Sequence, residues 1–245
     1  MEAYSSLAAQ YDKYMVHVPY DDWKEFIVKK FRENDINSGK IAELACGTGK
    51  MARLLAKEGY SIIASDISEE MLSEAVSSPS ENVLFVKADM RYLDLGESVD
   101  GAVCVCNGMN YIMELSELTE VFERVYENIA EGGVFIFDMN SLYKFKYVMA
   151  DNDVYDNRED GTFIWENFYD EKSRENQIDL TFYVECEDGR FERFEETHFQ
   201  KAYELKEVTD ALKTAGFKTI EIYDDYSEDA ICDETEYYTF VCKKC

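Results

Sequence analysis

The sequence predicts a doubly wound α/β fold, in which a mostly parallel sheet has helices on both faces and an antiparallel sheet is inserted late in the chain. Three observations predict it. Five short apolar runs alternate with helical stretches between residues 41 and 137, as βα repeats do. A glycine turn follows the first run. Beyond residue 160, strand-like segments follow one another without helices between them.

The first half of the chain reads as two opening helices and then the repeats. Pro19 separates the opening helices, which are expected at Ala3–Tyr14 and Tyr20–Phe31. The parallel strands are expected at Ile41–Ala45, Ser61–Ser65, Val83–Val86, Gly101–Val105 and Val134–Phe137. Between them we expect helices at Lys50–Glu58, from Ser68 onward, and at Ser116–Ile129, the last ended by Gly132-Gly133.

After Asn140 the pattern changes. Residues 141–160 show no clear periodicity, and three strands are then expected at Thr162–Tyr169, Gln177–Glu185 and Arg190–Lys201. The chain closes with a helix at Leu205–Ala215 and strands at Lys218–Tyr223 and Tyr237–Cys242. We therefore expect opening helices and a ligand-binding core at 1–140, an inserted β lid and substrate region at 141–201, and the end of the core at 202–245.

Composition limits the partners, the cellular location and the metal content that we expect. Asp and Glu number 52 against 25 Lys and Arg, a net charge of −27, which repels nucleic acid and anionic membranes and favours small or cationic partners. No apolar run could span a membrane and the N-terminus lacks a signal-peptide pattern, so a cytoplasmic protein is expected. The cysteines form no regular framework, and Cys242 and Cys245 lack partners for a metal site, so we expect no metal. No heptad or apolar patch indicates an oligomeric state.

The segment Glu43-Leu44-Ala45-Cys46-Gly47-Thr48-Gly49 is the main signal for function. Its glycines let a ligand approach the backbone, and they also match the weak dinucleotide pattern G-x-G-x-x-A. Charge separates the two interpretations. A carboxylate at Glu43 would repel the pyrophosphate of a dinucleotide, whereas S-adenosyl-L-methionine carries an ammonium and a sulfonium and no phosphate. Glu43 could act directly, through water, or by fixing the loop.

Two further acids follow the next two strands. Asp66 ends the second strand at the spacing where an acid binds both ribose hydroxyls. Asp89 follows the third strand, where a carboxylate can accept a hydrogen bond from the adenine amine. Open α/β sheets bind ligands at this edge, so three acids around one glycine turn indicate a site for a cationic nucleoside.

These motifs resemble the successive cofactor motifs of class I S-adenosylmethionine-dependent methyltransferases, with Ala45 standing where many members have their first glycine. The segments Tyr11-Asp12, Cys106–Tyr111 and His198–Tyr203 resemble bacterial small-molecule methyltransferases with a β-sheet lid. The resemblance implies a core of seven strands, the last antiparallel. It implies a cofactor site formed by Tyr11, Glu43, Ala45, Gly47, Gly49, Asp66, Ile67, Met71, Asp89, Met90, Cys106 and Asn107.

The acceptor is expected beside the end of the fourth strand. Asn107, Asn110 and Tyr111 are the polar groups there, and we expect Asn110 and Tyr111 to orient the acceptor by hydrogen bonding. A tyrosine of ordinary pKa is a poor base at neutral pH. Tyr111 could also simply pack under the lid. His198 could line the substrate pocket or only take part in strand pairing.

The leading hypothesis is a methyltransferase acting on a small-molecule acceptor by direct in-line transfer. Nitrogen, oxygen and carbon all stay open as the acceptor atom, as does the use of a general base. Methylation of a basic protein is the alternative within the same chemistry. An NAD(P)-dependent oxidoreductase and a non-catalytic cofactor-binding module are the alternatives outside it.

Overall fold

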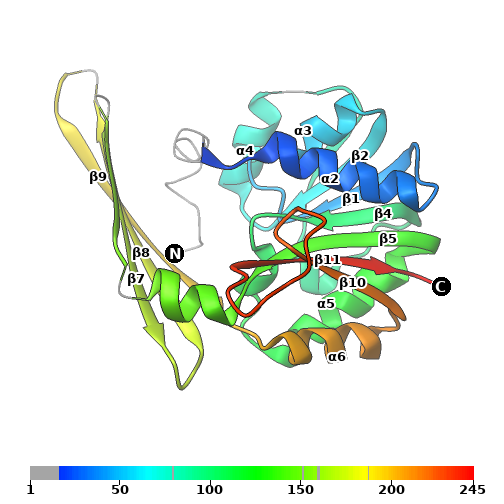
Figure 1. The fold of residues 1–245 in the computed structure, drawn as a ribbon. Coiled ribbons are helices and arrows are strands. Elements are labelled where there is room, and N and C mark those ends of the chain that lie inside the picture. Colours follow the sequence, from blue (N-terminus) through cyan, green and yellow to red (C-terminus); the bar gives the residue numbers. More distant parts are fainter. Residues whose placement is uncertain (1–16, 79, 151, 159–160, 187) are drawn as a thin grey trace.

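The computed structural model describes residues 17–78, 80–150, 152–158, 161–186 and 188–245, and its core is a seven-stranded sheet in the order β10-β11-β5-β4-β1-β2-β3 (Figure 1). Neighbouring strands are parallel except for β11, which runs antiparallel to both β5 and β10. The predicted fold class is confirmed. The strands of this sheet are β1 (Gly39–Leu44), β2 (Tyr60–Asp66), β3 (Val83–Lys87), β4 (Val99–Cys104), β5 (Ile129–Asn140), β10 (Thr219–Asp224) and β11 (Tyr237–Lys243).

Helices cover both faces of the sheet because its central strands are apolar on both sides. Along β5, Val134 and Ile136 pack under one face, while Phe135, Phe137 and Met139 pack on the other. The first face is covered by α2 (Tyr20–Glu33) and α3 (Lys50–Lys57), and the second by α5 (Leu115–Asn128) and α6 (Leu205–Ala215). A further helix, α4 (Glu69–Ser77), lies between β2 and β3 in the chain. Among the described residues, no helix is long and apolar enough to cross a membrane.

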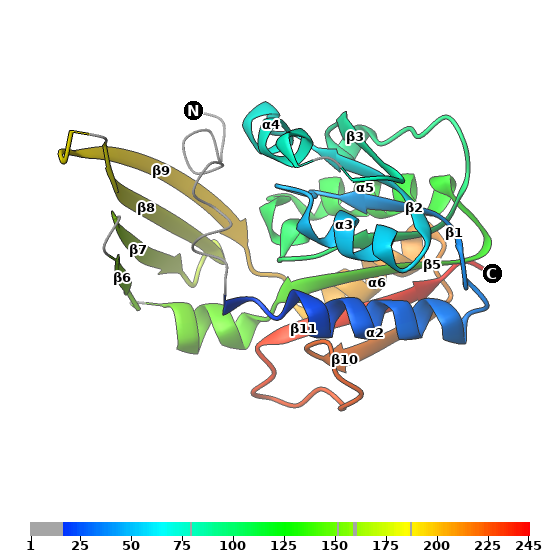
Figure 2. The same cartoon turned by 90° about the horizontal axis from the view of Figure 1, so that it is seen from above.

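A separate four-stranded antiparallel sheet, called the lid from here on, stands at the edge of the core where β5 ends (Figures 1 and 2). A short π-helical turn, η4 (Lys144–Met149), leads into it from β5. The lid has its own apolar cluster, with Phe145, Ile178 and Phe182 fully buried. Its strands are β6 (Val154–Arg158), β7 (Gly161–Asp170), β8 (Glu175–Glu185) and β9 (Phe191–Lys201).

One stretch holds elements that the sequence did not predict, and one local prediction is wrong. The stretch 141–160, read as aperiodic, contains η4 and the edge strand β6, which pairs with β7 on one side only and so needs no regular alternation. Gly132-Gly133 does not lie between helix and strand but inside β5, which starts at Ile129 directly after α5. A register shift against β4 between Val99 and Gly101 accommodates these glycines. The predicted helix at Ala3–Tyr14 lies outside the described residues.

Candidate functional site

The glycine turn joins β1 to α3 through three residues with positive φ, namely Ala45, Gly47 and Gly49. The two glycines serve different purposes. A Cβ on Gly49 would lie 2.5 Å from the Phe85 ring, so glycine is required there for packing against β3. A Cβ on Gly47 would meet no described residue within 4 Å, so in the described part of the chain the backbone at Gly47 borders open space. Only Gly47 therefore leaves room for a ligand beside the turn.

The side chain of Glu43 is buried beneath this turn, at 1 % exposure. It accepts a hydrogen bond from the backbone N–H of Ala52 in the first turn of α3, while its Oε2 atom is buried without a partner among the described residues. Burial raises the pKa of Glu43 to about 8; attraction to Arg53 opposes the shift and repulsion from Asp66 adds to it. Glu43 is therefore a buried acid that a nearby cation would ionise.

Asp66 at the end of β2 connects the two neighbouring turns. Its Oδ2 accepts from the backbone N–H of Gly47 at 2.8 Å, and its Oδ1 accepts from the N–H of Ser68 at 2.9 Å. Ser68 in turn caps α4 by accepting from the N–H of Met71. Burial raises the pKa of Asp66, and these N–H groups oppose the shift. A carboxylate has about four acceptor sites, so both oxygens can still bind a ligand.

Asp89 is held by an internal arginine. Its carboxylate accepts from the Nε atom of Arg91 at 3.0 and 3.1 Å, and from the Arg91 backbone N–H at 3.0 Å. Arg91 also pairs with Glu117 of α5 at 3.1 Å. Partial burial raises the pKa of Asp89, but the guanidinium outweighs it, so the pKa lies below its usual value. Asp89 is therefore an ionised acceptor of fixed orientation after β3.

The turn after β4 is strained. Cys106 and Asn107 follow one another at φ 61° and 59°, in the left-handed region that side chains other than glycine rarely adopt. Asp138 of β5 accepts from both of their backbone N–H groups, at 3.1 Å from Cys106 and 2.6 Å from Asn107. Gly108 follows them, and a Cβ on it would lie 3.1 Å from that of Ala45. The turn after β4 thus lies directly beside the glycine turn.

Asn110 joins the core to the lid. It lies in the 3₁₀ turn η3 (Gly108–Tyr111) and is fully buried. Its amide donates to the carbonyl of Lys201 in β9 at 2.8 Å and accepts from the N–H of Asn140 at 2.9 Å. This amide therefore holds the end of β9 against the end of β5.

Tyr111 and His198 meet across the boundary between core and lid. Their rings are edge to face, with centroids 5.9 Å apart. The Nε2 atom of His198 lies 3.2 Å from the Oε2 atom of Glu196, and both side chains are buried on the same face of β9. A tyrosine from the core and a His–Glu pair from the lid therefore converge at this boundary.

Comparison with known proteins identifies the family. A model of the methyltransferase domain matches residues 41–133. A protein of Geobacillus sp. strain WCH70 that carries a methyltransferase name is 35% identical, covering 98% of this chain and 99% of its own. The chain is a class I S-adenosylmethionine-dependent methyltransferase. Solved structures that resemble this methyltransferase cover nearly the whole of its chain, so the similarity includes the lid.

Two such structures are similar over nearly their full length. An S-adenosylmethionine-dependent methyltransferase from Clostridium acetobutylicum is 30% identical with a TM-score of 0.85, covering 98% of each chain. A sugar N-methyltransferase from Streptoalloteichus has a TM-score of 0.79 at 16% identity, covering 96% of this chain and 93% of its own. The second likeness shows a shared fold.

The residues of this methyltransferase fit its cofactor, S-adenosylmethionine. The cofactor has a cationic amino acid end, a sulfonium and a nucleoside without phosphates. Within the described residues, Glu43 offers a buried carboxylate whose Oε2 lacks a partner, Gly47 borders open space, and Asp66 keeps acceptor capacity. The Glu43 charge would bind the ammonium, Asp66 the ribose hydroxyls and Asp89 the adenine amine. When bound, the cofactor supplies an activated methyl group.

The other predicted cofactor residues are placed as follows. Ile67 is 54 % exposed beside Asp66, which leaves it accessible to a ligand, whereas Met71 is buried and Met90 half-buried. Tyr11 lies outside the described residues.

Sequence reasoning missed Asp138, although it is an acid at the end of a predicted strand, as Glu43, Asp66 and Asp89 are. It also missed Arg91, because nothing in the sequence indicates that a guanidinium folds back onto Asp89.

Proposed function

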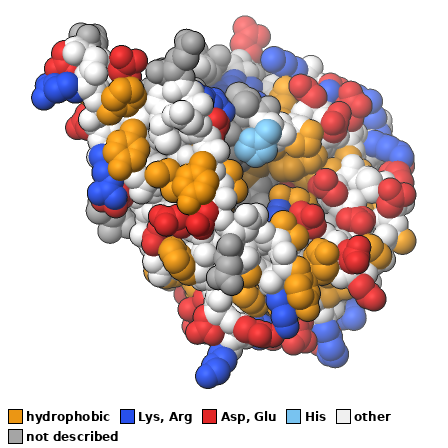
Figure 3. Space-filling model, turned by 60° about the vertical axis from the view of Figure 1, so that its left-hand side comes forward, with side chains coloured by type: hydrophobic (Ala, Val, Ile, Leu, Met, Phe, Trp, Pro, Cys, Tyr) orange, Lys and Arg blue, Asp and Glu red, His pale blue; other side chains and the backbone are white. Residues whose placement is uncertain are grey.

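We propose that this methyltransferase transfers the methyl group to a small molecule that binds between the core and the lid. The observation that carries the proposal is the contact of Tyr111 with His198, which brings one polar aromatic group from each side of that boundary together. In Figure 3 the surface is hollowed between lid and core, and hydrophobic side chains lie beside the hollow. Such a setting suits a small acceptor shielded from water.

The inward face of β9 supports the same proposal. Glu196, His198 and Gln200 alternate along it and are all at least nine-tenths buried, while Phe199 between them is about half exposed. Gln200 accepts from the side-chain amide of Asn140, which ends β5. Burying polar groups is costly unless they are hydrogen-bonded. The residues of β8 that pair with them include buried apolar side chains, so β9 places polar groups on a face that is largely apolar, and this favours a polar ligand.

Charge favours a neutral or cationic acceptor. The net charge of −27 repels phosphorylated molecules. The sugar N-methyltransferase from Streptoalloteichus has the same fold and acts, by its name, on a sugar nitrogen. The same net charge favours a basic protein as the second candidate, although a protein substrate would have to reach the site past the lid.

The residues of this chain would work by alignment. Methyl transfer from a sulfonium is an in-line displacement, so the enzyme has to hold the acceptor atom behind the methyl group and exclude water. Tyr111 would orient the acceptor by hydrogen bonding, and the His198–Glu196 pair would line the opposite wall.

Transfer of labelled methyl groups tests the proposal. The protein is incubated with methyl-labelled S-adenosylmethionine and a fractionated metabolite extract, with the protein fraction of the same cells in parallel. We expect label in a low-molecular-weight fraction, and much less of it with an Asp66→Asn variant at a limiting cofactor concentration. Label found only in protein would overturn the small-molecule proposal in favour of the basic-protein candidate.

A further inference from the structure

Asp138 is a fully buried carboxylate that is surrounded by hydrogen-bond donors. Besides the N–H groups of Cys106 and Asn107, it accepts from the hydroxyl of Tyr226 at 3.0 Å. Bonds from donors to a charged oxygen are about twice as strong as those between neutral groups. Taking a charge out of water is costly, and the three donors offset part of that cost for Asp138.

The turn that Asp138 holds cannot maintain its own conformation. Each left-handed residue other than glycine costs roughly 1–2 kcal/mol, and Cys106 and Asn107 are two in succession. Neither of their N–H groups takes part in the β ladder, and both point to one acceptor. Successive N–H groups directed at one anion form a stable concave arrangement. The charge of Asp138 therefore offsets the strain in the turn.

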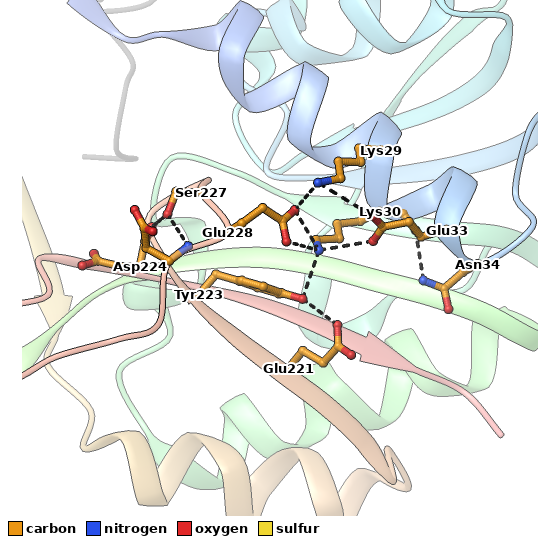
Figure 4. Close-up of polar contacts among 10 residues, drawn as sticks. Lys29, Lys30, Glu33, Asn34, Glu221, Tyr223, Asp224, Ser227 and Glu228 are labelled. Carbon is orange, nitrogen blue, oxygen red and sulfur yellow. Dashed lines mark hydrogen bonds and ion pairs between the residues drawn. The ribbon is translucent and has the colours of Figure 1, made fainter.

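Tyr226 braces Asp138 from the connection between β10 and β11. Its ring stacks on Trp23 of α2, with centroids 4.7 Å apart, and meets Phe26 edge to face. The same connection is tied to α2 by polar contacts (Figure 4). The buried Lys30 donates to Tyr223 and to Glu228, both at 3.0 Å. The ring of Tyr226 and the segment around it are thus both held against α2.

We propose that Asp138, braced by Tyr226, is a positioning residue that fixes the Cys106–Asn107 turn against the glycine turn and thereby sets the affinity for the cofactor. The turn packs beside Ala45 through Gly108, so a shift in it would change the wall of the cofactor site. The inference concerns cofactor binding and is independent of the acceptor that the enzyme methylates.

The positioning depends on the charge of Asp138, whose pKa lies at about 6. Burial raises the pKa of Asp138 to about 6; the bonds from Asn107, Tyr226 and Cys106 oppose the shift, and Asp225 adds to it. Among the described residues, the other titratable groups that interact with it electrostatically are Cys104 of β4, Cys106 of the turn after it, Lys144 of η4, and Tyr226 and Tyr237. Below pH 6 the protonated carboxyl is a weaker acceptor, so the turn is held less firmly.

Binding of S-adenosylhomocysteine, measured by calorimetry between pH 5 and pH 8, tests this role. Asp138→Asn places its amide N–H₂ either against the N–H of Asn107 or against the donors of Cys106 and Tyr226, so at least one bond to the turn is lost. At pH 7.5 we expect about a tenfold weaker affinity, the equivalent of one charge-assisted bond. Glu43 and Asp66 titrate in the wild type and in Asp138→Asn alike, so their contribution cancels in the ratio of the two affinities. The ratio of wild-type to Asp138→Asn affinity therefore isolates Asp138, and it should fall toward one below pH 6.

Two further variants keep the test decisive if Asp138→Asn does not fold. Tyr226→Phe removes one donor to the carboxylate, so it should weaken binding several-fold and move the acid loss of affinity to higher pH. Tyr223→Phe is the matched control, because this tyrosine also packs on Phe26 but bonds Lys30 instead of Asp138. It should bind as wild type does. Wild-type affinity and pH profile in Tyr226→Phe, or an equal loss in the control, would overturn the proposal.

Discussion

The carboxylate of Asp66 accepts a hydrogen bond from the backbone N–H of Gly47 at 2.8 Å, which ties the end of β2 to the turn after β1. The acid expected to bind the ribose therefore also shapes the turn that faces the cofactor. Its second oxygen holds Ser68, the cap of α4. A single side chain thus links both turns and one helix terminus.

Asp66→Asn is expected to lower both stability and cofactor affinity. The amide N–H₂ must face either Gly47 or Ser68, so one buried N–H loses its acceptor. We expect about 1–3 kcal/mol less free energy of unfolding in urea, and at least about tenfold weaker binding of S-adenosylhomocysteine. Asp94→Asn is the control, since exposed Asp94 makes the same kind of bond, to the N–H of Gly96. Unchanged affinity in Asp66→Asn would contradict the role of Asp66.

Binding of the cofactor is expected to release a proton from Glu43. With its pKa at about 8, Glu43 is mostly protonated at pH 7, and a cationic ammonium nearby would ionise it. Calorimetry in buffers of different ionisation enthalpy should show release of about one proton per cofactor bound. Glu43→Gln should abolish this release and weaken affinity by about 10- to 100-fold. Equal proton release in both proteins would place the ammonium elsewhere.

Glu43 should also make the free protein less stable as the pH rises. Its pKa is about 8 when folded and 4.5 in an ordinary setting, so between these values the native state holds a proton that the unfolded state has lost. This contribution to stability is fully present below pH 4.5 and is lost as the pH rises through 8. The free energy of unfolding should therefore fall more steeply from pH 5 to pH 8 in wild type than in Glu43→Gln. Parallel urea-unfolding profiles would show that Glu43 ionises normally.

The two glycines of the turn should respond differently to alanine. At Gly47 a methyl group would enter open space, so Gly47→Ala should fold with about 1 kcal/mol lost to its left-handed backbone, but bind S-adenosylhomocysteine at least tenfold more weakly. Gly49→Ala would collide with Phe85, so it should lose several kcal/mol of stability. Ala45→Gly, on the same turn, should leave both properties nearly unchanged. A Gly47→Ala protein with normal affinity would remove Gly47 from the site.

Tyr111→Phe should separate orientation of the acceptor from cofactor binding. Loss of the hydroxyl should lower turnover by about tenfold, the equivalent of one hydrogen bond, while the affinity for S-adenosylhomocysteine stays near that of wild type. Tyr92→Phe, on an exposed tyrosine, is the control. If turnover on the acceptor were unaffected, Tyr111 would only pack under the lid.

The core could be predicted because its signals are local. Apolar strands, the glycine turn and the acids at strand ends lie within a few residues of one another, and the strand ends are brought together by the parallel sheet itself. The lid was predicted less well. Its edge strand β6 has a partner on one side only, so its sequence need not alternate. Within the core, the start of β5 was also misjudged, because the glycines inside this strand resemble the end of a helix.

The sequence by itself determined the fold class, the family and the acids that surround the cofactor turn, because periodicity and charge sign are properties of neighbouring residues. Tertiary structure decided what those acids contact. Arg91 folds back onto Asp89, Glu43 lies under α3 with a raised pKa, and Asp138 reaches across 31 residues to hold the turn at Asn107. These contacts depend on burial and on the register between strands, which bring together groups that the chain keeps apart.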